Sequence, residues 1–188
     1  FPIGSEWDRT SSMDLGLQEQ FNRLEAQRQR AVSAAAALPE TDRVLAMPGS
    51  AWSPAQVLTH CVMAEQEFLR RMASTAESGT GGLTPTRSPL FGAALLLMRF
   101  PLVAVPAPES MIPAADASLE SAARGWDLVR SDLRGWLESV DDPSRTVLCV
   151  HPIFGALSAK QVLTVMEAHG TYHAKRDVAR WERLAARS

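Results

Sequence analysis

The stretch that decides the fold is residues 151–176, HPIFGALSAKQVLTVMEAHGTYHAKR. Within it, Ser158 and Gln161 form the Ser-x-x-Gln pattern of a capping box, in which the serine and glutamine side chains satisfy the first free amides of a helix. His169 and His173 follow, four residues apart. That spacing places both on one helical face, about 6 Å apart along the axis. The stretch therefore predicts a capped helix that presents two imidazoles on the same side.

A second segment begins with the same capping pattern. Residues 53–59, SPAQVLT, match residues 158–164, SAKQVLT, and the large apolar side chains of Trp52 and Leu157 precede the two serines as hydrophobic staples. Counted from the capping serine, His60 stands at position +7, and the paired histidines of the other segment stand at +11 and +15. These positions fall on one stripe of a helix with 3.6 residues per turn. His60 is therefore expected to face the same interior as the histidine pair.

Helical periodicity recurs in four segments, and the alternation of β-branched residues that marks strands is nearly confined to Thr146–Val150. The predicted helices span residues 14–38, 54–77, 114–140 and 159–186. Short connections join the first helix to the second and the third to the fourth, which favours antiparallel neighbours. A connection rich in glycine and proline separates the second helix from the third. We predict an all-α four-helix bundle with up-down-down-up topology and a long crossover between helices two and three.

The crossover, residues 78–113, contains the most apolar part of the chain, residues 90–105. This part is shorter than the ~20 residues of a membrane-spanning helix and is interrupted by Arg99 and Pro101. We expect it to cover one flank of the bundle, with a short helix around Leu90–Arg99 as an option. No membrane association is predicted.

The beginning of the chain lacks the apolar core of a signal peptide. Residues 1–13 are interpreted as an irregular lead-in or an expression remnant, with Met13 as a candidate native start. Residues 14–188 are expected to form a single domain, since one hydrophobic core suits this length.

Charge and cysteine content exclude several functional classes. Charged residues make up 21% of the chain and the formal net charge is −2, so no basic surface is expected to attract nucleic acid. Cys61 and Cys149 are too few for the disulfide framework of a small secreted domain, which indicates a reducing compartment and a cytoplasmic location.

Three neutral imidazoles suit zinc, nickel, copper or iron and leave a coordination position open. The competing interpretation is that these histidines are hydrogen-bonded core residues, because a four-residue histidine spacing also arises by chance. The fourth histidine, His151, is assigned to local packing or a hydrogen bond to its turn. Cys61 points about 100° away from His60 around the helix and is expected to be a buried apolar residue.

Residues 52–60, WSPAQVLTH, and residues 151–176 resemble the DinB/YfiT-like superfamily of bacterial four-helix bundles. The resemblance implies that His60, His169 and His173 bind a divalent metal, with zinc or nickel favoured. One departure is Arg176, because similar proteins often carry glutamine three residues after the last histidine.

The same resemblance implies a metal-dependent enzyme acting on a small electrophilic substrate, either as an S-transferase that uses a low-molecular-weight thiol such as bacillithiol or mycothiol, or as a hydrolase that uses metal-bound water. It also implies a homodimer. Because the crossover is apolar around Leu95–Val105, we expect the contact surface there. Two alternatives stay open: a non-catalytic metal- or small-ligand-binding stress-response protein, and a metal-free helical interaction module. The spacing of the glutamates selects none of Glu65, Glu67 and Glu167 as a proton carrier.

Overall fold

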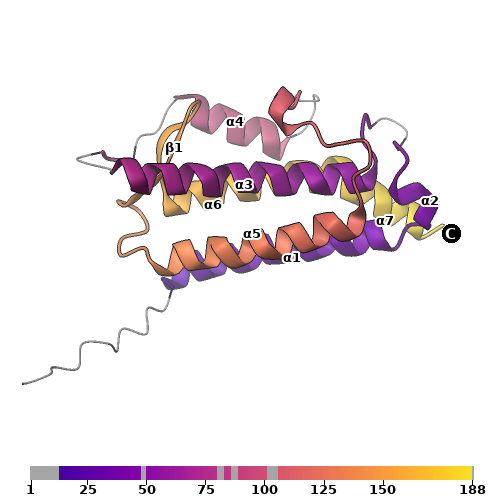
Figure 1. The fold of residues 1–188 in the computed structure, drawn as a ribbon, viewed down its shortest axis with the longest axis horizontal. Coiled ribbons are helices and arrows are strands. Elements are labelled where there is room, and N and C mark those ends of the chain that lie inside the picture. Colours follow the sequence, from indigo (N-terminus) through magenta and orange to yellow (C-terminus); the bar gives the residue numbers. More distant parts are fainter. Residues whose placement is uncertain (1–12, 48–49, 80–82, 86–88, 101–105, 188) are drawn as a thin grey trace, which may run out of the picture.

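The structure is a computed structural model that describes residues 13–47, 50–79, 83–85, 89–100 and 106–187. This part is mostly helical, and its long helices pack side by side (Figure 1). They are α1 (Leu15–Ala36), α3 (Pro54–Ser78), α5 (Leu119–Glu138) and α6 (Ala159–His173). In Figure 1, α1 and α6 begin at the end of the molecule where α3 and α5 finish.

Both expected capping boxes are present. The backbone amide of Ser53 donates to Gln56 Oε1 over 3.0 Å, and that of Ser158 donates to Gln161 Oε1 over the same distance, 3.0 Å. Ser118 caps α5 in a simpler way, since its side chain accepts a hydrogen bond from the amide of Ser121. The third helix therefore begins at Leu119, later than the periodicity alone predicts.

The last helical stretch is interrupted after His173. A π-helical turn, η2 (Ala174–Val178), follows α6, and α7 (Ala179–Ala185) completes the stretch. Such π-turns widen the helix by one residue and are frequent at functional sites.

The connections also carry short helices. α2 (Glu40–Arg43) lies between α1 and α3, and the crossover contains α4 (Pro89–Arg99) and η1 (Glu109–Met111). The optional short helix in the crossover is thus confirmed as α4, which packs against α6 and leaves Leu90, Leu96, Leu97 and Phe100 exposed. Residues 101–105, the remainder of the expected dimer contact, lie outside the described part of the chain. Over the ranges that the structure covers, no helix has the length and apolarity to cross a membrane.

The mostly helical structure is compatible with the expected all-α class, and it adds a small antiparallel hairpin of β1 (Val147–His151) and β2 (Gly155–Ser158). Its first strand coincides with the one segment that has strand character. Gly155 adopts a positive φ of 77°, a conformation that side chains disfavour, and allows the chain to reverse. Because β2 ends at Ser158, the hairpin leads directly into the cap of α6.

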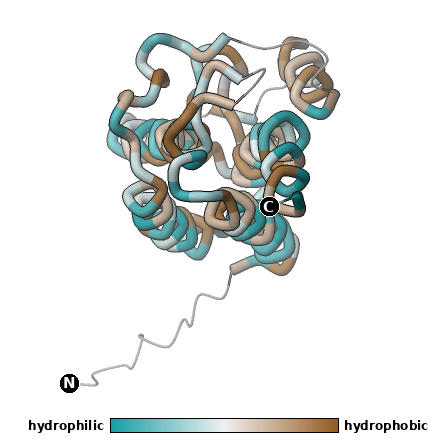
Figure 2. The backbone as a smooth tube through the Cα atoms, turned by 90° about the vertical axis from the view of Figure 1, so that its right-hand side faces the viewer, coloured by the Kyte–Doolittle hydropathy of each residue, from teal (hydrophilic) through white to brown (hydrophobic). Residues whose placement is uncertain are grey.

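The interior consists of two hydrophobic clusters with a polar layer between them. One cluster includes Leu17, Phe21, Leu24, Met72, Leu133 and Met166, and the other includes Ala31, Leu58, Val62, Trp126, Val129 and Trp181. Glu25, Glu65 and Arg130 lie between members of the two clusters along α1, α3 and α5. Figure 2 views the helices end-on around this interior.

Met13, the last residue of the expected lead-in, is 8% exposed and packs in the first cluster, so the packed chain includes it.

Candidate metal centre

The three histidines singled out by the sequence lie together between α3 and α6. His60 comes from α3, and His169 and His173 come from consecutive turns of α6. One nitrogen from each ring lies within 4.8 Å of the nitrogens of the others. The ring centroids of His169 and His173 are 4.8 Å apart, and that of His60 lies 5.2 Å and 5.3 Å from them. The prediction that these side chains converge is confirmed.

Hydrogen bonds at Nδ1 fix two of the rings. His60 Nδ1 lies 2.9 Å from the backbone oxygen of Met111, and His173 Nδ1 lies 2.8 Å from Asp177 Oδ2. Because a carbonyl or carboxylate oxygen only accepts, each Nδ1 carries the proton and donates it. In a neutral imidazole the other nitrogen, Nε2, is then unprotonated and free to bind a cation.

The distance between ligand atoms also suits a metal. The Nε2 atoms of His60 and His169 are 3.3 Å apart. Two nitrogens bound to one tetrahedral zinc at about 2.1 Å would lie about 3.4 Å from each other. The residues therefore fit a divalent ion with three nitrogen ligands, on spacing and on the orientation of the rings.

The electrostatic environment favours the neutral forms of His60 and His169. Burial lowers the pKa of His60, an effect that its hydrogen bond to Met111 partly opposes. Burial, with the neighbouring imidazoles His173 and His60, holds the pKa of His169 well below its usual range. By surface area His169 is only partly buried, and its Nε2 lies 3.3 Å from that of His60. Neutral imidazole is the form that binds metals.

Aromatic side chains pack against the group on two sides. The Trp52 ring lies 4.8 Å from the ring of His60, and the Tyr172 ring lies 5.1 Å from that of His173. Arg176, the departure from the family pattern, places its guanidinium 5.3 Å from the Tyr172 ring centroid. The hydrogen bond of His173 is with the residue that follows Arg176, Asp177, and not with Arg176 itself.

Sequence reasoning missed two supporting groups, Asp177 and the Met111 carbonyl. Asp177 continues the four-residue spacing of His169 and His173, so the pattern His-x3-His-x3-Asp was a usable signal. The role of Met111 could not be predicted from the sequence. Its contact with His60 uses a backbone oxygen, which every residue has, and depends on where the crossover places η1.

The other candidate residues lie elsewhere in the fold. His151 does not join the histidine group among the described residues, and its Nδ1 accepts from the amide of Ile153 over 3.2 Å, as expected for a turn residue. Cys61 is buried, which raises its pKa well above the usual value. Cys149 is also buried, and burial raises its pKa to about 11. Each of the three glutamates forms a salt bridge with arginine, Glu65 to Arg130, Glu67 to Arg70 and Arg71, and Glu167 to Arg23.

Comparison with known proteins identifies the family. A sequence model of the DinB superfamily matches residues 23–175, which include all three histidines and most of the chain. No curated protein and no solved structure gives a significant match. The chain belongs to the DinB superfamily.

Proposed function

We propose that His60, His169 and His173 bind one divalent cation, with zinc or nickel as the favoured metal. The observation that carries the proposal is the 3.3 Å separation of the His60 and His169 Nε2 atoms. In the same group, His60 Nδ1 is hydrogen-bonded to the Met111 carbonyl and His173 Nδ1 to Asp177. The competing interpretation, that these histidines are hydrogen-bonded core residues, does not require three imidazole rings to meet at one point.

We further propose that the protein is a metal-dependent enzyme acting on a small electrophilic molecule. A cation held by His60, His169 and His173 would keep its charge, because the three ligands are neutral, and would supply a nucleophile near neutral pH by lowering the pKa of a thiol or water. The leading reaction is S-transfer from a low-molecular-weight thiol, and hydrolysis is the second. The contribution of the chain itself is to hold the rings: Asp177 orients His173, and Met111 orients His60.

The proposal includes the fold and the assembly. The chain directions in Figure 1 and the long crossover support an up-down-down-up four-helix bundle. The exposed apolar side chains of α4 support a homodimer. The absence of a strong basic charge and of a disulfide framework supports a cytoplasmic protein that binds neither nucleic acid nor membranes.

Metal analysis of the purified protein tests the centre. Wild type should bind about one zinc or nickel ion per chain, and His169→Ala should lose it. His151→Ala is the matched control, because it removes a histidine outside the group and should bind metal normally. Equal metal content in wild type and His169→Ala would refute the assignment.

Thiol titration of cobalt-substituted protein then tests the reaction class. A change in the visible cobalt spectrum on adding a low-molecular-weight thiol would show direct coordination. Turnover of a panel of electrophiles with that thiol supports the S-transferase, and turnover without thiol supports the hydrolase. Metal binding with no turnover of either kind would favour a non-catalytic binding protein.

A further inference from the structure

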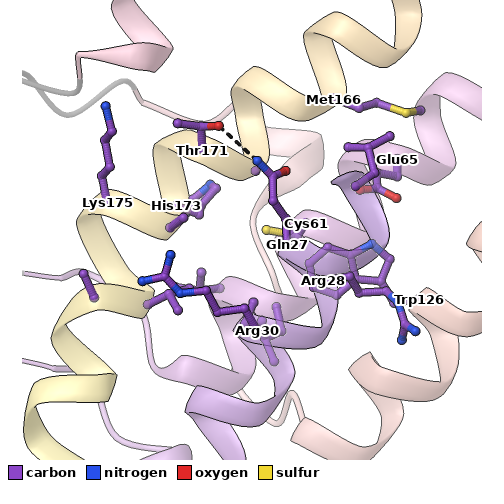
Figure 3. Close-up of a pocket in the computed structure, with 18 of the residues that line it drawn as sticks. Gln27, Arg28, Arg30, Cys61, Glu65, Trp126, Met166, Thr171, His173 and Lys175 are labelled. Atoms are coloured by element: carbon purple, nitrogen blue, oxygen red, sulfur yellow. Dashed lines mark hydrogen bonds between the residues drawn. The ribbon is translucent and has the colours of Figure 1, made fainter. Parts of the chain in front are cut away.

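A cavity of about 290 Å³ lies inside the helical assembly, at the level of the polar layer between the two hydrophobic clusters. Its lining comes from α1, α3, α5, α6, η2 and α7, and Figure 3 shows several of these side chains around it. The apolar walls include Leu24, Val57, Leu58, Met166, Val178 and Trp181. Arg30 and Lys175 form an exposed rim. The cavity touches His173 and not the other two histidines, so it is a separate feature that borders the proposed metal centre.

Arg130 contributes a buried hydrogen-bond donor to this cavity. Its side chain is only 5% exposed, and its Nη2 donates to Glu65 Oε1 over 2.7 Å. Its Nε lies 3.2 Å from Glu25 Oε1. Its Nη1 is buried and has no hydrogen-bond partner within the described part of the chain. An unsatisfied buried donor costs about 1–3 kcal/mol, so an occupant that accepts this bond would be stabilising.

Gln27 contributes a buried acceptor. Its Nε2 donates to Thr171 Oγ1 over 3.1 Å (Figure 3) and to the backbone oxygen of Glu167 over 3.4 Å, which fixes the orientation of the amide. Its Oε1 is buried without a hydrogen-bond partner among the residues described. Gly170 permits this placement, because a Cβ there would lie 2.5 Å from Gln27 Oε1.

The charges around the cavity favour a neutral occupant. Arg130 and Arg28 are paired with three carboxylates, those of Glu65, Glu25 and Asp127. At the rim, Arg30 is paired with Glu182, and Lys175 donates to the backbone oxygen of Arg99. The buried part of the cavity therefore has no net positive charge to attract an anion, and a cation would lie near three guanidinium groups and an ammonium.

Glu65 and Trp126 also line the cavity with buried polar atoms, and the indole of Trp126 acts on the Glu65 carboxylate. Arg130 Nη1 and Gln27 Oε1 then stay as one donor and one acceptor among apolar walls, a composition typical of small-molecule sites.

We propose that this cavity binds a small, neutral, largely apolar molecule that carries both a hydrogen-bond acceptor for Arg130 Nη1 and a donor for Gln27 Oε1, as a carboxamide does. The site is distinct from the metal centre and does not require a metal. Ordered water is the competing occupant of such a polar space.

Benzamide is a suitable probe, with toluene and benzoate as matched apolar and anionic comparisons. Titration calorimetry should show benzamide binding at least about tenfold more tightly than benzoate, since desolvating a carboxylate without net positive charge is costly. Binding should be unchanged in His169→Ala, so a failure of the metal centre does not affect this test. A soaked crystal should show benzamide against Arg130 and Gln27.

Two variants locate the binding. Ala31 lines the cavity and is 7% exposed, so Ala31→Leu should fill the space and reduce benzamide binding at least about tenfold. Ala36→Leu, on the exposed side of the same helix, should bind benzamide as wild type does. Gln27→Leu should weaken benzamide and leave toluene unaffected, which keeps the test valid if Ala31→Leu does not fold. The proposal is overturned if the three probes bind alike, if Ala31→Leu and Gln27→Leu both bind benzamide normally, or if the soaked crystal contains only water.

Discussion

Replacing Asp177 should weaken metal binding without removing a metal ligand. Asp177 Oδ2 lies 2.8 Å from His173 Nδ1, and the two side chains are 11% and 10% exposed. A buried carboxylate at this position holds the ring with Nε2 directed at the other histidines and increases the basicity of that nitrogen. The effect depends on the proposed centre, because it acts through His173.

The magnitude follows from the type of hydrogen bond. A bond to a charged group is worth about 1.5–3 kcal/mol, and 1.4 kcal/mol corresponds to a factor of ten, so removing the bond should weaken metal binding about 10- to 150-fold. Asp177→Asn keeps a neutral acceptor and should lie near the lower limit, about tenfold. Asp177→Leu keeps the approximate size but no acceptor, and should lie near 100-fold, about the upper end.

Competition with a zinc-binding dye of known affinity measures this series. Asp132→Asn, an exposed aspartate on α5, is the matched control and should bind zinc as wild type does. Melting curves in excess chelator separate an effect on folding from an effect on affinity. The reasoning is refuted if both Asp177 variants are folded and bind zinc within about twofold of wild type.

Three further predictions concern stability and assembly. Folding lowers the pKa of His169, so between that pKa and about 6.5 the unfolded chain binds a proton that the folded chain does not. The free energy of unfolding of chelator-treated protein should therefore fall as the pH falls through this window. Urea titrations should show a shallower loss for His169→Asn. Arg130→Met leaves Glu65 buried without its partner and should cost about 3–5 kcal/mol, whereas adding Glu65→Leu should restore much of it; equal stability of the single and double variants would contradict this. Leu96→Lys, in the exposed face of α4, should convert a dimer to a monomer in light scattering, and Leu15→Lys, at an exposed site on α1, should not.

The sequence predicted the three histidines of the site better than the structural elements that hold them in place. The capping serines and the spacing of His60, His169 and His173 were sufficient to place all three rings on facing stripes, because helical periodicity is a local property. The hairpin before α6 was missed as an element, since five residues with strand character form a strand only when a partner lies beside them. Its partner, Gly155–Ser158, has no alternating pattern of its own.

The buried polar layer of Glu25, Glu65 and Arg130 could not be predicted from the sequence for a related reason. Glu65 and Arg130 are far apart in sequence, and each is an ordinary charged residue of an amphipathic helix until α3 and α5 pack. Their burial, and the unsatisfied Nη1 that motivates the ligand proposal, depend on which faces of the two helices meet.

The sequence by itself determined the main helical segments, the capping boxes that start α3 and α6, the register of the three histidines and the family, because each depends on residues within a few turns of one another. Only the tertiary structure decided that Met111 from the crossover fixes His60 and that a cavity opens beside Arg130. Those features arise from contacts between segments distant in sequence, and no local pattern records which distant segments will meet.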